Sequence, residues 1–106
     1  MLRYQVLLPI CFNDGSVVPH HLHDHAIDQI VGKFGGASVD WDGMEGQWKD
    51  EHGKLHKEGM IDLFVDTPIG EWEATFQWFS ERKKEWEHTF RQDVIYIVTY
   101  SILVVC

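Results

Sequence analysis

The sequence has 106 residues, of which 44% are apolar and 25% are charged, and its 9 basic and 17 acidic side chains give a formal net charge of −8. This length and composition are typical of one globular domain, so we expect residues 1–106 to fold as a unit. The negative charge disfavours phosphate backbones and anionic membranes, so neither a nucleic acid nor a membrane is an expected partner. Cys11 and Cys106 are too few for a disulfide framework and no signal-peptide pattern is present, so we expect a cytoplasmic protein.

The first half of the chain contains a strand pattern, a helix pattern and a hairpin pattern. Residues 3–12 alternate between apolar and polar positions, which predicts a strand. Residues 19–34 carry apolar side chains at steps of three and four, which predicts a helix. Residues 37–48 and 59–66 alternate again, and a polar tract with Gly53 separates them, so they are predicted to form a hairpin. Gly53 at its tip is expected to have a positive φ angle.

The second half of the chain contains one helix pattern and one strand pattern. Thr67 precedes Pro68 and is predicted to cap a helix over residues 70–90. The last strand is predicted over residues 94–105, and it is apolar on both faces. The helix carries an aromatic stripe that we expect to pack on a sheet, formed by Trp72, Phe76, Phe79, Trp86 and Phe90.

The order strand, helix, strand, strand, helix, strand predicts a ferredoxin-like split βαβ fold, an α+β structure with one antiparallel sheet and two helices on one face. The strand order expected for this fold is 4-1-3-2, which places the last strand at an edge of the sheet. Two helices cover one sheet face, yet both faces of the last strand are apolar. Because an apolar edge strand with a bare face favours association, we expect a homodimer in which a second copy covers that face.

Aromatic side chains on the strands are the candidate ligand-binding residues. Aromatic rings supply flat apolar surface, and tyrosine adds a hydroxyl that can donate a hydrogen bond. The alternative interpretation is packing across the hairpin for Trp48 and a dimer contact for Tyr96 and Tyr100. The residues expected to line a small-molecule site between the uncovered sheet face and the partner are Trp41, Trp48, Phe64, Tyr96 and Tyr100.

Histidines are concentrated at the start of the first predicted helix. His21 and His25 are four residues apart and therefore share a helix face, with Asp24 next to them. Two imidazoles and a carboxylate form a ligand set for a divalent metal, so these three residues are the candidate metal ligands. The spacing matches no recognised zinc motif, and a solvated first helical turn is the alternative interpretation.

Two stretches of the chain resemble a family of small bacterial proteins of unknown function. The segment from Gly46 to Glu58 matches their signature, which is roughly G-x-W-x-D-x-x-G before an apolar strand, and residues 90–94, Phe-Arg-Gln-Asp-Val, resemble the start of their last strand. The resemblance implies a ferredoxin-like fold and brings no established activity, cofactor or catalytic residue. Within the signature, Trp48 is expected to pack across the hairpin on an apolar residue. Gln92 is expected to bond backbone groups where the last strand begins.

Three functional hypotheses follow from these patterns. The first is a homodimeric ligand-binding or accessory module of uncharacterised function. The alternative is a dimeric α+β barrel-type enzyme acting on a small apolar or aromatic substrate, with or without a metal, in which Asp40, Asp42 or the histidines from His20 to His25 transfer protons. The third is a structural protein whose apolar last strand docks on another protein.

Overall fold

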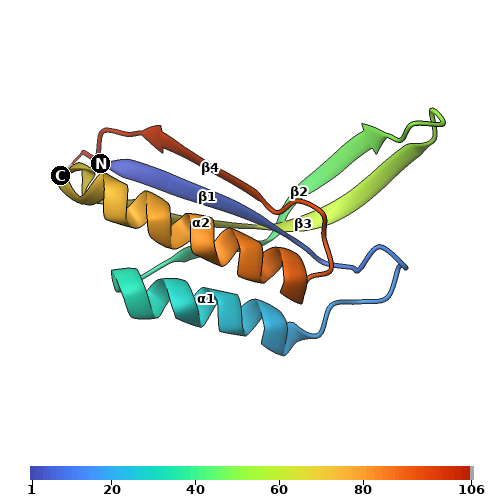
Figure 1. Ribbon diagram of the computed structural model, residues 1–106, viewed down its shortest axis with the longest axis horizontal. Helices are drawn as coiled ribbons and strands as arrows, with labels where there is room; N and C mark the ends of the chain where they lie inside the picture. Colours follow the sequence, from blue (N-terminus) through green and yellow to red (C-terminus); the bar gives the residue numbers. More distant parts are fainter. Residues whose placement is uncertain (106) are drawn as a thin grey trace.

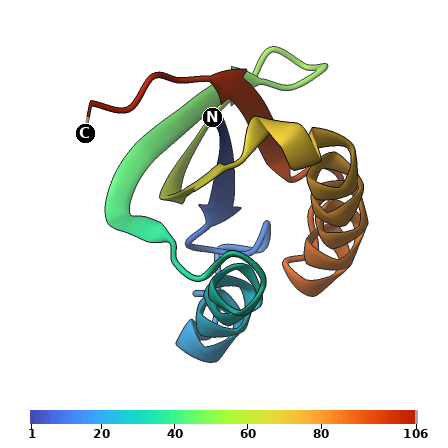
Figure 2. The ribbon, with the colours of Figure 1, turned by 90° about the vertical axis from the view of Figure 1, so that its left-hand side faces the viewer.

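The structure is a computed structural model that describes residues 1–105, so Cys106 lies outside the described residues. Four strands form one antiparallel sheet in the order β2-β3-β1-β4. Both helices lie on one face of this sheet (Figures 1 and 2), which confirms the predicted ferredoxin-like arrangement and places β4 at an edge. The elements are β1 (Leu2–Pro9), α1 (His20–Phe34), β2 (Ser38–Lys49), β3 (Leu55–Thr67), the short 3-10 turn η1 (Ile69–Glu71), α2 (Trp72–Thr89) and β4 (Tyr96–Ser101).

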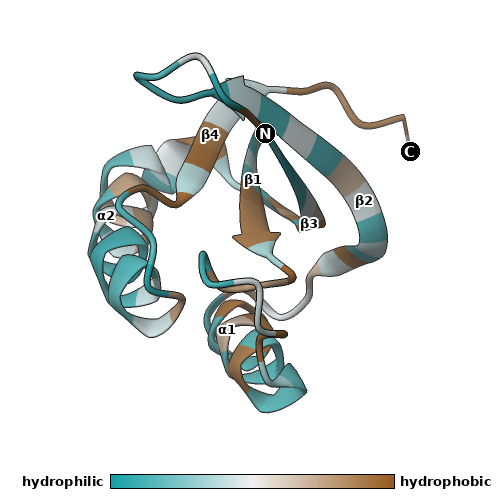
Figure 3. Ribbon diagram, turned by 90° about the vertical axis from the view of Figure 1, so that its right-hand side faces the viewer, coloured by the Kyte–Doolittle hydropathy of each residue, from teal (hydrophilic) through white to brown (hydrophobic). Residues whose placement is uncertain are grey.

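The core lies between the two central strands and the two helices. Alternate residues of β1 and β3, such as Val6 and Leu63, point toward the helices and are buried. Ile30 of α1 and Trp86 of α2 meet them from the other side. The indole N–H of Trp86 donates to the side-chain oxygen of Gln29 at 2.8 Å, so this buried polar group is paired across the two helices. In Figure 3 the apolar colour follows β1 and the inner side of α1, while much of α2 is hydrophilic.

Helix α1 begins and ends where the sequence pattern predicts. Pro19 precedes its first residue, and Gly35 ends it with a φ angle of 85°, a conformation that glycine adopts without steric cost. The N–H of Gly35 donates to the carbonyl of Val31 at 2.8 Å and so pairs one of the terminal carbonyl groups. Within the described residues, no helix is long and apolar enough to cross a membrane.

The start of α2 differs from the prediction in two respects. Thr67 is not a helix cap, because it is the buried last residue of β3 and its hydroxyl donates to the carbonyl of Leu2 at 3.0 Å. The aromatic stripe is buried only in part: Phe79 stacks on Tyr4 at 4.2 Å, whereas Trp72 and Phe76 are 51% and 52% exposed. The first turns of α2 therefore leave part of the predicted core face open to solvent.

Strands β2 and β3 extend beyond the sheet as a two-stranded arm, residues 44–60 (Figure 1). Asp40 pairs with Asp62 and Met44 with Met60, so residues 41–43 of β2 lie opposite the single residue Ile61. Such a bulge bends a strand and increases its twist, which gives the physical reason why the arm turns away from the sheet. The sequence predicted β3 from residue 59, but pairing begins at residue 55 and makes the arm longer than expected.

Strand β4 is shorter than predicted and leaves one of its faces uncovered. It pairs with β1 only over Tyr96–Ser101, and residues 102–105 continue without strand structure. On the face away from the helices, Tyr96 is 58% and Tyr100 is 44% exposed, as expected for an uncovered apolar face.

The same face of the central strands is polar, which the sequence pattern of the last strand did not indicate. Arg3 forms a two-pronged ion pair with Asp66, with nitrogen–oxygen distances of 2.8 and 3.1 Å. The side-chain amide of Gln5 donates to both carboxylate oxygens of Asp62 at 3.0 and 3.1 Å. Outside the arm, the exposed large apolar side chains of this face are therefore those of β4.

Candidate functional site

A cavity of about 980 Å³ lies where the arm leaves the sheet, and we call it the arm cleft. One wall is the arm, through residues 48 and 56–60. The other wall combines the loop after β1, residues 11–13 and 15, with the segment that leads into β4, residues 92–94 and 96. Three segments that are distant in the sequence thus meet around one space.

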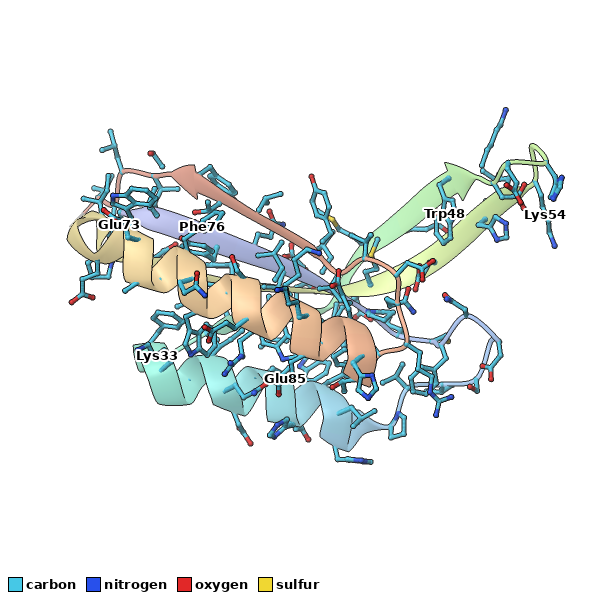
Figure 4. All side chains as sticks on the ribbon, viewed as in Figure 1. Lys33, Trp48, Lys54, Glu73, Phe76 and Glu85 are labelled. Atoms are coloured by element: carbon cyan, nitrogen blue, oxygen red, sulfur yellow. The ribbon has the colours of Figure 1, made fainter. Side chains whose placement is uncertain are left out.

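The arm wall carries an aromatic and imidazole pair. Trp48 of β2 lies directly opposite His56 of β3, so both side chains are on the same face of the arm. Their rings stack with centroids 5.2 Å apart and an angle of 14° between the planes. Figure 4 shows Trp48 on the arm, close to the tip that carries Lys54. The partner of Trp48 is therefore an imidazole, not the apolar residue that the sequence predicted.

Asp50 connects the turn of the arm to this ring pair. Its Oδ1 accepts hydrogen bonds from the backbone N–H groups of His52 and Lys54, each at 2.9 Å. These two bonds close the turn at the tip of the arm. Its Oδ2 lies 2.9 Å from Nε2 of His56. The bond from His56, followed by the two backbone bonds, holds the pKa of the Asp50 carboxyl below its usual value. Gly53 has a φ angle of 79°, as predicted for the tip.

Glu58 supplies an acidic group to the same wall. It follows His56 by two residues on β3 and so projects from the same face, about 7 Å further along the strand. Burial raises the pKa of the Glu58 carboxyl, because a low-polarity environment penalises its charged form. A carboxyl group in this environment can hold a proton closer to neutral pH than an exposed one.

The second wall is held together by polar side chains from two loops. The amide nitrogen of Gln92 lies 3.3 Å from the side-chain oxygen of Asn13 and 3.1 Å from the carbonyl of Phe90. Asn13 donates in turn to the carbonyl of Arg91 at 3.4 Å, and the Arg91 guanidinium lies 4.5 Å from the ring centre of Phe12. Gln92 bonds the backbone carbonyl of Phe90 just before the last strand, as expected from the sequence.

The five predicted ligand-binding residues lie in three separate places. Trp48 and Tyr96 both line the arm cleft. Phe64 and Tyr100 lie near Arg3 instead: the guanidinium sits 4.1 Å from the ring centre of Phe64, and Tyr100 is opposite Arg3 on β4.

Trp41 lies on the helix side of the sheet, apart from the other four. It stacks on His20 of α1 at 4.6 Å and meets the edge of His23 at 6.1 Å. The structure therefore does not gather the five aromatic residues into one site.

The predicted metal ligands are not gathered into one group either. Asp24 lies 3.7 Å from His20, and His25 lies 4.0 Å from Glu85 of α2, whereas His21 is exposed. Residues 1–105 contain no group of three or more histidine, cysteine or acidic side chains arranged to hold a metal ion. Metal binding by His21, Asp24 and His25 stays a prediction from the sequence.

The acidic pair of the bulge makes a local contact only. Asp40 accepts the backbone N–H of Asp42 at 3.0 Å, and both side chains are exposed. Neither carboxyl lines the arm cleft. Glu58, an acidic residue that does line the cleft, was not singled out from the sequence. Its alternation with His56 and the pairing of the hairpin nevertheless put Glu58, His56 and Trp48 on one face.

No protein-family model matches the chain, and a search of curated proteins finds no relative. Among solved structures, a phage SAM lyase in complex with S-methyl-5'-thioadenosine is similar, with a TM-score of 0.64 and 13% identity over 93% of this chain and 79% of that one. A phage SAM lyase in the apo state is also similar, with a TM-score of 0.63 and 14% identity over 93% of this chain and 78% of that one.

The divalent cation tolerance protein Cut A1 from Thermus thermophilus is also similar, with a TM-score of 0.62 and 13% identity over 100% of this chain and 88% of that one. At these identities the likeness concerns the backbone arrangement alone. Together with the strand order, it establishes that the chain has the ferredoxin-like α+β fold.

Proposed function

We propose that this protein binds a small molecule in the arm cleft. The observation that carries the proposal is the convergence of three chain segments around about 980 Å³ of space, a volume at the upper end of the usual range for ligand sites. The Trp48–His56 stack and the exposed ring of Tyr96 offer flat apolar surface. Glu58 and Asp93 offer oxygen atoms that accept hydrogen bonds.

This lining favours a ligand with a flat ring system and at least one hydrogen-bond donor. Aromatic rings stack on Trp48 and Tyr96, while a donor group of the ligand reaches the acceptors of the arm. S-methyl-5'-thioadenosine, the compound bound by the similar phage SAM lyase, has this general character and is a suitable first probe. Adenosine is a second probe that tests the ring system alone.

The test compares two tryptophans of the same strand. Trp48 lines the cleft and is 46% exposed, whereas Trp41 is 40% exposed and faces α1. We expect Trp48→Leu to weaken probe binding at least tenfold, about 1.4 kcal/mol, because it removes the stacking surface. Trp41→Leu is the matched control and should leave affinity unchanged in calorimetric titrations. Equal losses in both variants, or no binding to either probe by the wild type, would contradict the proposal.

We also propose that the protein is a homodimer in the cytoplasm. The exposed apolar residues of β4 support association, because they form an edge strand that a second copy can cover. The arm supports it as well, since an isolated two-stranded ribbon has little stability of its own in water. A reducing compartment agrees with the two cysteines, which allow at most one disulfide in 106 residues.

A second candidate function is proton-transfer catalysis on the bound molecule. The observation that favours it is Glu58, whose pKa is raised by burial beside a histidine that an aspartate orients. Such a carboxyl can act as a general acid in the cleft while the imidazole accepts a proton. Formation of a product from a bound probe, followed by chromatography, distinguishes catalysis from binding alone.

A further inference from the structure

The arm tip contains an aspartate that contacts both the backbone of a turn and a side chain of the cleft. Oδ1 of Asp50 is occupied by the N–H groups of His52 and Lys54, which fixes the carboxylate in the plane of the turn. Oδ2 is then left to bond Nε2 of His56 at 2.9 Å. The position of His56 is therefore set by the same group that closes the hairpin.

This contact determines which nitrogen of His56 carries the hydrogen. A carboxylate has acceptor atoms only, so the 2.9 Å contact requires a hydrogen on Nε2 when the imidazole is neutral. The lone pair of the ring is then on Nδ1, which makes no hydrogen bond to any residue in the range 1–105. The stack on Trp48 fixes the plane of the ring at the cleft wall.

We propose that Asp50 is a positioning residue that holds His56 in the tautomer with no hydrogen on Nδ1. In this form, Nδ1 of His56 accepts a hydrogen bond or a proton from an N–H or O–H group of the ligand. The inference rests on the proposed function, because it assigns a role within the arm cleft. It gives a physical role to three positions of the hairpin signature: Trp48 stacks on the histidine, Asp50 orients it, and Gly53 permits the turn that brings Asp50 to it.

The decisive substitution is Asp50→Asn. Asparagine retains an oxygen for the two backbone N–H groups, but it places an NH₂ donor next to Nε2 of His56. A donor at that position requires a lone pair on Nε2, so the hydrogen of the neutral ring must move to Nδ1. We expect nitrogen NMR at about pH 8, where imidazole is neutral, to show the Nε2–H form in the wild type and the Nδ1–H form in the variant.

Two histidines of the arm permit a matched control. His52 is close to Glu51 at 3.5 Å, but its side chain is 83% exposed and makes no stacked pair among the ring contacts of the described residues. Glu51→Gln should leave the His56 signals unchanged. A wild-type His56 that shows the Nδ1–H form, or an unchanged tautomer in Asp50→Asn, overturns the inference. If the variant fails to fold, the wild-type spectrum is compared between the two histidines: the Nε2–H fraction of His56 must exceed that of the exposed His52, and equal fractions overturn the inference.

The test of the Asp50 role can succeed or fail independently of the test of ligand binding in the arm cleft. The tautomer is measured without ligand, so a change from the Nε2–H form in the wild type to the Nδ1–H form in Asp50→Asn supports the positioning role of Asp50 even if the probes do not bind. Addition of adenosine tests whether Nδ1 of His56 contacts the ligand. Binding that shifts the NMR signal of Nδ1 of His56, and not the signals of the ring nitrogens of His52, supports this contact. Binding without any shift at Nδ1 overturns the role of His56 and leaves the cleft as a binding site.

Discussion

His23 differs from the other histidines at the start of α1 because it is buried. It is 4% exposed, and its ring stacks on Phe90 at 5.4 Å. Nε2 lies 2.9 Å from the carbonyl oxygen of Pro9, so the neutral ring donates a hydrogen bond there. Burial lowers the pKa of His23, and the charge of His20 acts in the same direction, while the bond to Pro9 and the charge of Asp24 oppose it.

This environment predicts a loss of stability in mild acid. A histidine whose pKa is lower in the folded chain contributes stability that is complete above its unfolded pKa, about 6.5, and declines as the pH falls toward the folded value. We expect the free energy of unfolding, measured in urea, to fall between about pH 7.5 and pH 5.5. His23→Gln retains a donor for Pro9 but does not titrate, so the fall should become shallower.

His52→Gln is the control for His23, because the side chain of His52 is 83% exposed. If His23→Gln and the wild type lose stability in parallel as the pH falls, the role given to His23 is wrong.

Single histidines show where sequence analysis reaches its limit. The histidines from His20 to His25 are dense in the sequence, yet the structure buries His23, places His20 and His25 near different carboxylates and leaves His21 exposed. His56 stands alone in a polar tract and had no local signal. Its role depends on a cross-strand partner and on an aspartate six residues earlier, and both are brought to it by the turn. Helical spacing predicts which residues share a face, but not which of them the rest of the chain covers.

The bulge in β2 is the element that separates the arm from the sheet. Gly43 occupies it, and a Cβ at this position would lie 2.6 Å from Cβ of Asp62 and 3.0 Å from the backbone nitrogen of Asp62. Gly46 is also close to its neighbour, but there the contact is the terminal methyl of Met60 at 2.5 Å. A flexible methionine end can move away, whereas the backbone of a paired strand cannot.

We therefore expect different costs for two alanine substitutions. Gly43→Ala should lower the free energy of unfolding by about 1–3 kcal/mol, since the clash has to be relieved by a shift of paired backbone. Gly46→Ala should cost less, because Met60 can adopt another rotamer. Urea unfolding of both variants beside the wild type provides the measurement, and a larger loss for Gly46→Ala would show that the bulge tolerates a side chain.

The elements themselves were largely predictable, and their deviations have local causes. Both helices and the order of the strands follow from hydrophobic periodicity. The predicted strand β3 began only at residue 59, because residues 55–60 include Gly59 and polar residues on both faces. Such a composition is typical of a strand with solvent on both sides. The prediction extended β4 to residue 105 because the chain stays apolar, but regular pairing with β1 ends at Leu2 and Ser101, and one residue further Ile102 makes a backbone bond to Met1.

At the scale of the whole molecule, the uncovered face of the sheet is divided between paired polar side chains and apolar residues. The pairs of Arg3 with Asp66 and Gln5 with Asp62 occupy the central strands, while the exposed rings belong to β4. Association through this face is therefore expected to centre on β4. The sequence predicted the surplus apolar face of β4 but not the polar pairs beside it, because these depend on cross-strand register.

Two valine-to-lysine substitutions test this interface. Val98 faces away from the helices in the middle of β4, opposite Gln5, whereas Val31 is 41% exposed on α1. A charge buried against an apolar partner is costly, so Val98→Lys should convert the proposed dimer to a monomer at micromolar concentration. Val31→Lys should have no effect on mass measured by sedimentation equilibrium. A monomeric wild type at that concentration would contradict the dimer.

The arm is joined to the rest of the molecule mainly through two backbones, because its sides are exposed and its aromatic stack is internal to it. Segments with few buried contacts open locally at a much smaller free-energy cost than the core that anchors them. One wall of the cleft can consequently fray and close again while the four-stranded sheet stays intact. A ligand of the proposed site would then enter and leave on the timescale of a hairpin opening, without unfolding of the domain.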